Sequence, residues 1–190
     1  MDKNRMEAFS DAVIAIIITI MVLELKIPHG TEWSALKPLT SVFICYIMSF
    51  AYLAIYWNNH HHLLKAIKSV DGKALWANMV LLFWLSLIPF VTGWMGENHF
   101  AKIPVLLYGI NLLCAAVSYN ILVKVLIASH GQDSLLAKAV GKDTKGKLSM
   151  MLYVLAIGVA FLIPLIACAI FALVAVIWLI PDQRIEKILK

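Results

Sequence analysis

Long apolar segments separated by short charged ones constrain the fold of this chain more than any other feature of its sequence. Hydrophobic residues make up 62% of the 190 residues and charged residues only 14%, whereas soluble domains average about 45–50% and about 25%. So few charges cannot cover the surface of a soluble protein, and apolar blocks of this length are typical of helices that cross a bilayer. We therefore predict an all-α, polytopic membrane protein, with residues 1–190 forming a single domain.

Six segments are candidate membrane helices, and Pro89 is predicted to kink the third. They cover approximately residues 8–27, 39–57, 75–96, 104–128, 148–163 and 164–180. The last two come from one apolar run of 33 residues, 148–180, which would be about 50 Å long as one helix, against a hydrocarbon core of about 30 Å. Because proline tolerates the start of a helix better than its middle, we expect a turn near Ile163 and Pro164 to divide that run.

The distribution of lysine and arginine predicts that both ends of the chain lie in the cytoplasm. With six spans and the amino terminus inside, the inner side carries Lys3, Arg5, Lys65, Lys68, Lys73, Lys138, Lys142, Lys145, Lys147, Arg184, Lys187 and Lys190. The outer side carries only Lys26, Lys37 and Lys102, which gives the positive-inside bias of membrane proteins. The net charge of +5 is therefore interpreted as orientation and lipid contact, not as a nucleic-acid-binding surface.

Several short motifs follow one another in a fixed order along the chain. The first is R-x-x-x-F-S-D at the start of the first span, and the others follow on the second, third and sixth spans. They comprise Arg5, Phe9, Ser10 and Asp11; Tyr56, Trp57, His60 and His61; Asn78; Pro89, Phe90 and Thr92; and Trp178 with Pro181. This set resembles the lysosomal potassium channel family, the transmembrane protein 175 type, and its prokaryotic members.

The resemblance implies a potassium-preferring cation channel of a prokaryotic plasma membrane, built from six-helix subunits. The prokaryotic members are expected to be homotetramers in which the first helix lines a central pore. The expected partners are then potassium ions, membrane lipids and further copies of this chain. Like that family, the sequence lacks the T-V-G-Y-G filter of ordinary potassium channels. It also shows no residue arrangement typical of an enzyme, and we expect neither a cofactor nor a resident metal.

The first span carries an apolar stripe that suits the lining of a pore. At about 100° per residue, Ile16, Ile20 and Leu23 share one face, and four copies around an axis would form apolar rings that close a pore by excluding water. The resemblance points to Ile16 and Ile20 as this hydrophobic gate, followed by Leu23, with Thr19 on the flank. The alternative is that the stripe packs against lipid or another helix, as most such stripes do.

Asp11 lies about 140° around the same helix from Ile16, so it is predicted to face its own subunit. A carboxylate near the membrane is costly unless it is paired or hydrogen-bonded, and we expect Ser10 and Asp11 to bond to neighbouring helices. The predicted network that fixes the angle of the first helix consists of Arg5, Phe9, Ser10, Asp11, Trp57, His60, His61 and Asn78. The alternative is a simple helix cap formed by Ser10 or Asp11.

Glu24 lies next to the stripe at the predicted outer end of the first helix. Four copies of this carboxylate would concentrate cations at an outer mouth. The alternative is a solvated rim residue that pairs with Lys26.

The histidine cluster His60, His61 and His62 suits hydrogen bonding better than metal binding. Consecutive helical residues point about 100° apart, so the three rings cannot share one ion. The alternative function for the chain is a proton- or ion-coupled secondary transporter that uses Asp11 with His60 and His61. Many transporters have paired helices broken at glycines, and the glycines of these spans show no such pairing.

Overall fold

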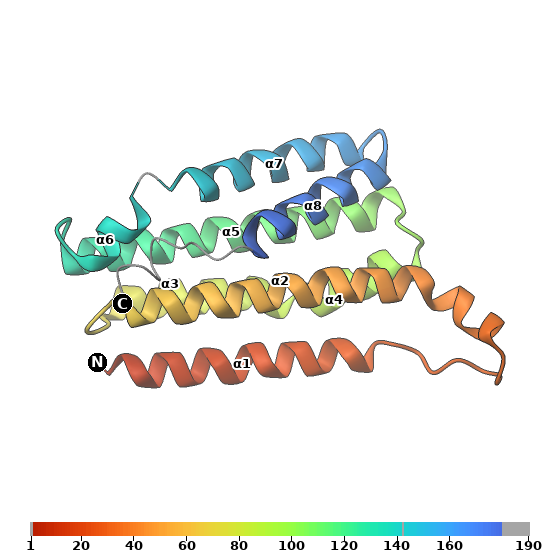
Figure 1. Ribbon diagram of the computed structural model, residues 1–190, viewed down its shortest axis with the longest axis horizontal. Helices are drawn as coiled ribbons and strands as arrows, with labels where there is room; N and C mark the ends of the chain where they lie inside the picture. The colour runs from red at the N-terminus through yellow and green to blue at the C-terminus, as the bar shows by residue number, and fades with distance from the viewer. Residues whose placement is uncertain (1, 142, 180–190) are drawn as a thin grey trace.

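A computed structural model describes residues 2–141 and 143–179 as a bundle of helices, with no strand in these ranges (Figure 1). In chain order the elements are α1 (Lys3–Leu23), η1 (Trp33–Leu39), α2 (Thr40–Lys65), α3 (Gly72–Ser86), α4 (Ile88–Glu97), α5 (Lys102–His130), α6 (Leu135–Val140), α7 (Thr144–Ala160) and α8 (Pro164–Leu179). The predicted all-α class is confirmed. Lys142 and residues 180–190, on which the expectations for Pro181, Arg184, Lys187 and Lys190 fall, lie outside the described residues.

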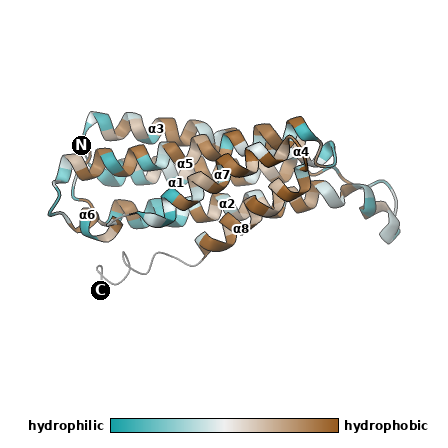
Figure 2. Cartoon of the chain, turned by 90° about the horizontal axis from the view of Figure 1, so that it is seen from above, coloured by the Kyte–Doolittle hydropathy of each residue, from teal (hydrophilic) through white to brown (hydrophobic). Residues whose placement is uncertain are grey.

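The helices have the length and polarity of a membrane protein. Within the described ranges, four segments are long and apolar enough to cross a bilayer, namely Lys3–Leu23, Trp33–Lys65, Gly72–Glu97 and Lys102–His130, and α8 is a shorter apolar helix. Figure 2 shows apolar residues along the middle of the bundle and hydrophilic residues at its two ends. Successive long segments run in opposite directions, so that α1, α3 and α7 all begin at one end (Figure 1), which we call the amino-terminal end.

Carboxylates cap α1, α3 and α7, which all begin at the amino-terminal end. Asp71 accepts a hydrogen bond of 2.8 Å from the amide of Ala74 at the start of α3, and Asp143 accepts one of 3.1 Å from the amide of Gly146 at the start of α7. Such caps satisfy amides that have no partner within the helix. The Ala74 amide, followed by the Ser129 hydroxyl, also lowers the pKa of Asp71, because both bonds favour the ionised carboxylate.

The third apolar segment is broken, and not only kinked, near Pro89. α3 and α4 are separated at Leu87, and Pro89 stands in the first turn of α4. Proline has no N–H to donate to the preceding turn, so a helix that reaches it loses a backbone hydrogen bond. Asn111 of α5 donates from its Nδ2 to the carbonyl of Trp84 at 3.2 Å, next to this break. A side chain of the neighbouring helix thus supports a backbone that the bilayer cannot solvate.

Several helix boundaries differ from those expected from the sequence. α1 runs from Lys3 to Leu23, whereas a span of about 8–27 was expected. α2 continues through the histidine cluster to Lys65 instead of ending near residue 57, because polar residues such as His60 are buried in the bundle and hydrogen-bonded there. α7 begins at Thr144, before the apolar run itself, because Asp143 caps it. The short elements η1 and α6 were not expected. Residues 161–163 separate α7 from α8, and Pro164 is the first residue of α8.

α2 and α4 pack closely through small and hydroxyl-bearing residues. A side-chain carbon placed on Gly96 would lie 2.7 Å from the Cα atom of Val42 in α2. Beside it, the Ser41 hydroxyl donates to the carbonyl of Gly96 at 2.8 Å. One turn or more away, the hydroxyls of Ser49 and Thr92 lie 2.6 Å apart. Close backbone approach with hydroxyl bonds is the usual way for helices to associate in lipid, where no hydrophobic force drives them together.

Gly96→Ala should therefore destabilise the protein by about 1–3 kcal/mol, because the added methyl meets backbone that cannot move without shifting α2. Gly93→Ala in the same helix is the matched control, since the nearest atom to its added carbon is the Glu24 Oε2 at 4.0 Å. Thermal unfolding in detergent measures both. Equal midpoints for the two variants would show that the α2 and α4 backbones are not in contact at Gly96.

Candidate ion pathway

α1 lies at the edge of the bundle and packs on α2, α3 and α4 (Figure 1). Its packed face consists of Met6, Ser10, Ile14, Ile17 and Met21, all of them buried. The spacing of these residues by three or four positions is that of one helix face. The opposite face of α1 therefore points away from the rest of its own subunit.

The apolar stripe singled out in the sequence lies on this outward face. Ile16 is 56% exposed, Ile20 45% and Leu23 80%. Thr19 is exposed beside them, and its hydroxyl donates to the carbonyl of Ile16 at 2.9 Å. The Thr19 oxygen keeps lone pairs that a cation can approach. Within one subunit, nothing described covers this stripe.

A groove of about 660 Å³ runs beside the stripe, between α1 and the α3–α4 segment. Ile16 and Ile20 form one wall, and Phe90 and Trp94 of α4 form the other. The rings of Phe90 and Trp94 stack, with centroids 6.2 Å apart. The groove is therefore apolar along most of its length, and only its far end is charged.

The charged end of the groove carries Glu24 and Glu97. Among the described residues, Lys26 pairs with Glu97 (Nζ to Oε1, 2.6 Å) and not with Glu24. Glu97 raises the pKa of Lys26, mainly by accepting its hydrogen bond. Glu24 itself is the exposed residue that caps the carboxyl end of α1. Its carboxylate is thus left beside the stripe, at the end of the molecule opposite the amino terminus.

Three buried polar side chains form a chain of hydrogen bonds between α1, α3 and α2. The Ser10 hydroxyl donates to the carbonyl of Met6 at 2.8 Å and accepts from the Asn78 Nδ2 at 2.9 Å. The Oδ1 of Asn78 lies 2.8 Å from the Nε2 of His60, which donates to it. Ser10, Asn78 and His60 are each at most 1% exposed. They join three helices at a single depth of the bundle.

A second set of contacts links α1 to α2 closer to the surface. The Trp57 indole donates to Asp11 at 3.0 Å, and the Nδ1 of His61 lies 2.9 Å from the Oε1 of Glu7. The rings of Trp57 and His61 are stacked, with centroids 6.2 Å apart. Sequence reasoning missed Glu7. The spacing of the residues could have indicated it. Glu7 and Asp11 are four residues apart on α1, and Trp57 and His61 are four residues apart on the antiparallel α2. Each residue of one pair therefore lies opposite one residue of the other pair.

Two members of the predicted network lie outside these contacts. Arg5 and Phe9 are exposed, and no hydrogen bond or ion pair joins Arg5 to another residue in the described ranges. Both belong to the outward face of α1, four residues apart. The described residues also contain no group of three or more His, Cys, Asp and Glu side chains that could hold a metal ion.

Comparison with known proteins places this geometry in a family. The model of the family described as the endosomal/lysosomal potassium channel TMEM175 matches residues 5–89, which include most of α1, all of α2 and the Ser10, Asn78 and His60 chain. A potassium channel of Chryseobacterium sp. (strain P1-3) is 54% identical over 190 residues, covering 100% of this chain and 99% of the relative. The endosomal/lysosomal proton channel TMEM175 of Danio rerio is 29% identical over 68% of this chain and 25% of its own length.

A solved structure agrees with the sequence relatives. The crystal structure of a lysosomal potassium-selective channel TMEM175 homolog from Chamaesiphon minutus superimposes with a TM-score of 0.84 at 26% identity, covering 95% of this chain and 98% of that one. The likeness extends over nearly the whole of both chains, and the resemblance drawn from the sequence motifs is confirmed. The chain therefore belongs to the family of the endosomal/lysosomal potassium channel TMEM175.

Proposed function

We propose that this chain is the subunit of a potassium-selective cation channel whose pore is lined by α1. The observation that carries the proposal is the outward face of α1, where a row of large apolar side chains is left uncovered by its own subunit. The names of the bacterial relatives as potassium channels support the same function. No enzymatic role is proposed, since these relatives and the family are channels.

The proposed assembly is a homotetramer of six-helix subunits around a central pore. Four copies of α1 would bring Ile16, Ile20 and Leu23 to a common axis as three successive rings. The groove between α1 and α4 would then lie against a neighbouring subunit, which supplies the packing that one subunit lacks. Such rings close a narrow pore by excluding water, and Thr19 would offer a hydroxyl to an ion when they open.

Six crossings with both ends in the cytoplasm are supported by the short helices α7 and α8. At about 1.5 Å per residue they extend about 25 Å each, slightly less than the hydrocarbon core of about 30 Å, and η1 on the opposite side is not counted as a crossing. Lys3 donates to the carbonyls of Leu64 and Ile67, so the amino terminus shares its end of the bundle with the α2–α3 loop and its lysines. This basic end is assigned to the cytoplasmic side of a prokaryotic plasma membrane.

The chain of Ser10, Asn78 and His60 supports the proposed role of a clamp that sets the rotation of α1. All three side chains are buried between helices of the same subunit. They therefore do not face the stripe along which ions are proposed to pass. The hydrogen bonds of these side chains within the subunit also weigh against the secondary transporter. In that alternative, Asp11, His60 and His61 would have to bind and release protons or ions. Asp11 and His61 are engaged with Trp57 and Glu7 instead.

Planar-bilayer recording of the reconstituted protein tests the function. We expect unitary currents that reverse near the potassium equilibrium potential. Slow saturating flux without unitary events would support a transporter, and reversal that follows the proton gradient would contradict potassium selectivity.

In the same recordings, Ile16→Asn should raise conductance or leak because it wets the constriction, whereas Ile16→Val should leave the current near wild type. Unchanged current in Ile16→Asn would remove Ile16 from the gate.

The clamp is tested by Ser10→Ala, which leaves the buried Asn78 Nδ2 without an acceptor. We expect a loss of stability of about 1 kcal/mol, within the range for interhelical hydrogen bonds in membranes and orphaned buried donors. Ser118→Ala is the matched control, because the buried Ser118 hydroxyl donates to the carbonyl of Cys114 in its own helix and bonds to no other helix in the part of the chain that is described. Thermal unfolding and the oligomeric fraction on size exclusion measure the effect. If the two variants behave alike, the hydrogen-bond chain does not hold α1.

A further inference from the structure

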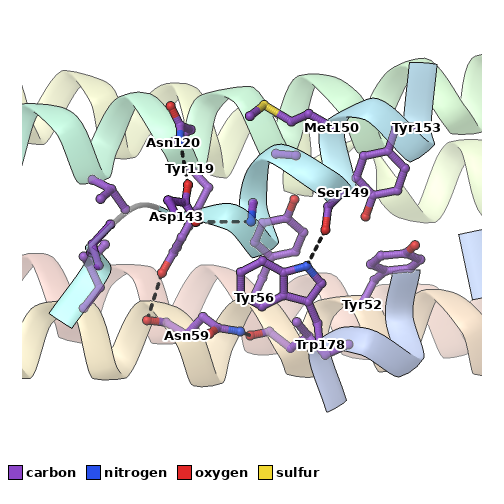
Figure 3. A pocket seen from close by; sticks show the side chains of 16 residues that line it. Tyr52, Tyr56, Asn59, Tyr119, Asn120, Asp143, Ser149, Met150, Tyr153 and Trp178 are labelled. Atoms are coloured by element: carbon purple, nitrogen blue, oxygen red, sulfur yellow. Dashed lines mark hydrogen bonds between the residues drawn. The ribbon is translucent and has the colours of Figure 1, made fainter. Parts of the chain in front are cut away.

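A second cavity, separate from the α1 groove, lies inside the bundle. It has a volume of about 90 Å³ and is bounded by α2, α5, α7 and α8 near the start of α7. Figure 3 shows its wall, which is formed mainly by Tyr56, Asn59, Tyr119, Asp143, Tyr153 and Trp178. None of these side chains lies on the stripe or in the clamp, so neither the proposed pore nor the helix packing on α1 uses this space.

The cavity is rich in hydrogen-bond acceptors. The Nδ2 of Asn59 donates to the carbonyl of Ile55 at 2.8 Å, but its Oδ1 accepts no hydrogen bond from any residue of the described ranges. Asn59 as a whole is only 7% exposed, and its side chain lines the cavity. The hydroxyl of Tyr56 likewise has no partner in the described part of the chain. Both oxygens can therefore accept hydrogen bonds from a group that enters the cavity.

Asp143 adds negative charge to the same wall. Its Oδ2 accepts from the Nδ2 of Asn120 at 3.0 Å, and its Oδ1 accepts from the amide of Gly146 at 3.1 Å. A carboxylate has about four lone-pair positions, so these two bonds leave it able to accept more. Asp143 also has a left-handed backbone, with φ of 43°, which is unfavourable for a residue other than glycine. The fold thus tolerates local strain at the residue that brings this charge to the cavity.

Aromatic rings form the rest of the wall. Tyr56 and Tyr119 meet edge to face, with ring centroids 6.1 Å apart. Trp178 is held by a 2.8 Å hydrogen bond from its indole to the Ser149 hydroxyl. The Nζ of Lys145 lies 5.0 Å from the centroid of Trp178, so one ammonium group of the chain itself already rests on this indole. Aromatic faces attract such groups through the negative charge above the ring.

We propose that this cavity is a binding site for a small primary ammonium cation. The N–H groups of the ligand would donate to Asp143 and to the Oδ1 of Asn59, and its short alkyl part would lie against Tyr56 and Trp178. The size is suitable, since a cavity of about 150 Å³ accepts benzene with its six carbons and this one is smaller. With so few atoms the ligand binds weakly, with a Kd of about millimolar.

Thermal unfolding of the full chain in detergent, titrated with ethylammonium chloride, tests the site. Sodium chloride at equal concentration corrects for ionic strength, and tetramethylammonium chloride tests the need for N–H donors. We expect a saturable rise in the unfolding midpoint with ethylammonium that neither other salt reproduces. A midpoint that rises no more with ethylammonium than with sodium would overturn the proposal.

Asp143→Asn keeps a side chain that caps α7 and removes the charge, and we expect it to raise the Kd at least tenfold. The control is Asp71→Asn, which removes the charge of an equivalent cap at the start of α3, outside the cavity, and should leave the Kd unchanged. Asn59→Leu is a second variant, independent of the cap, and should weaken binding at least threefold. Equal Kd values in Asp143→Asn and Asp71→Asn would contradict the assignment. Loss of ethylammonium binding in Glu24→Gln, with binding kept in Asp143→Asn, would also contradict the assignment. That result would place the ion in the groove beside α1.

Discussion

The hydrogen bonds that join Ser10 of α1 to Asn78 of α3 and His60 of α2 determine much of what this subunit presents to its surroundings. They lie in the buried interior, where a polar group without a partner is expensive, and we propose that they thereby limit the rotation of α1 about its axis. Once Ser10 faces inward, Ile16 and Leu23 face outward, because they lie about 120° and about 140° from it around the helix. Ile20 lies on the flank of that face and is also exposed. A polar contact in the core thereby selects the apolar surface that the proposed pore uses.

In the rest of the described bundle, too, several buried polar side chains find backbone partners inside the protein. Asn111 donates to a carbonyl beside the break at Leu87, and Ser41 donates to a carbonyl at the close approach of α2 and α4. The apolar segments of the sequence therefore carry few polar residues, and most of these stand at points where two or three helices meet. The cavity beside Asp143 is lined by further acceptors, the carboxylate of Asp143 and the Oδ1 of Asn59, which the proposed ligand would use.

The sequence predicts the all-α class and the family well, because both depend on long apolar runs and on a motif set that is read directly. It also predicts that Ser10 and Asp11 turn toward Trp57, His60 and Asn78, since carboxylates and hydroxyls in lipid need partners. Glu7 and the pairing of Lys26 with Glu97 are missed, because they depend on which residues of separate helices come level with one another. That register is set by packing, which periodicity in one helix does not contain. The end of α2 is missed for a related reason. A cluster of polar histidines indicates the end of a membrane helix unless buried hydrogen-bond partners on other helices are known.

The central claim is that copies of α1 meet around one axis with Ile16 turned inward. Distances between spin labels at position 16 measure this directly, using Ile16→Cys in a background without Cys45, Cys114 and Cys168. Val154→Cys, on an exposed face of α7, provides the comparison. The account predicts that labels at position 16 in the assembled protein lie closer to their copies in other subunits than labels at position 154 do. Shorter distances at position 154 would place α1 on the outside of the assembly and contradict it.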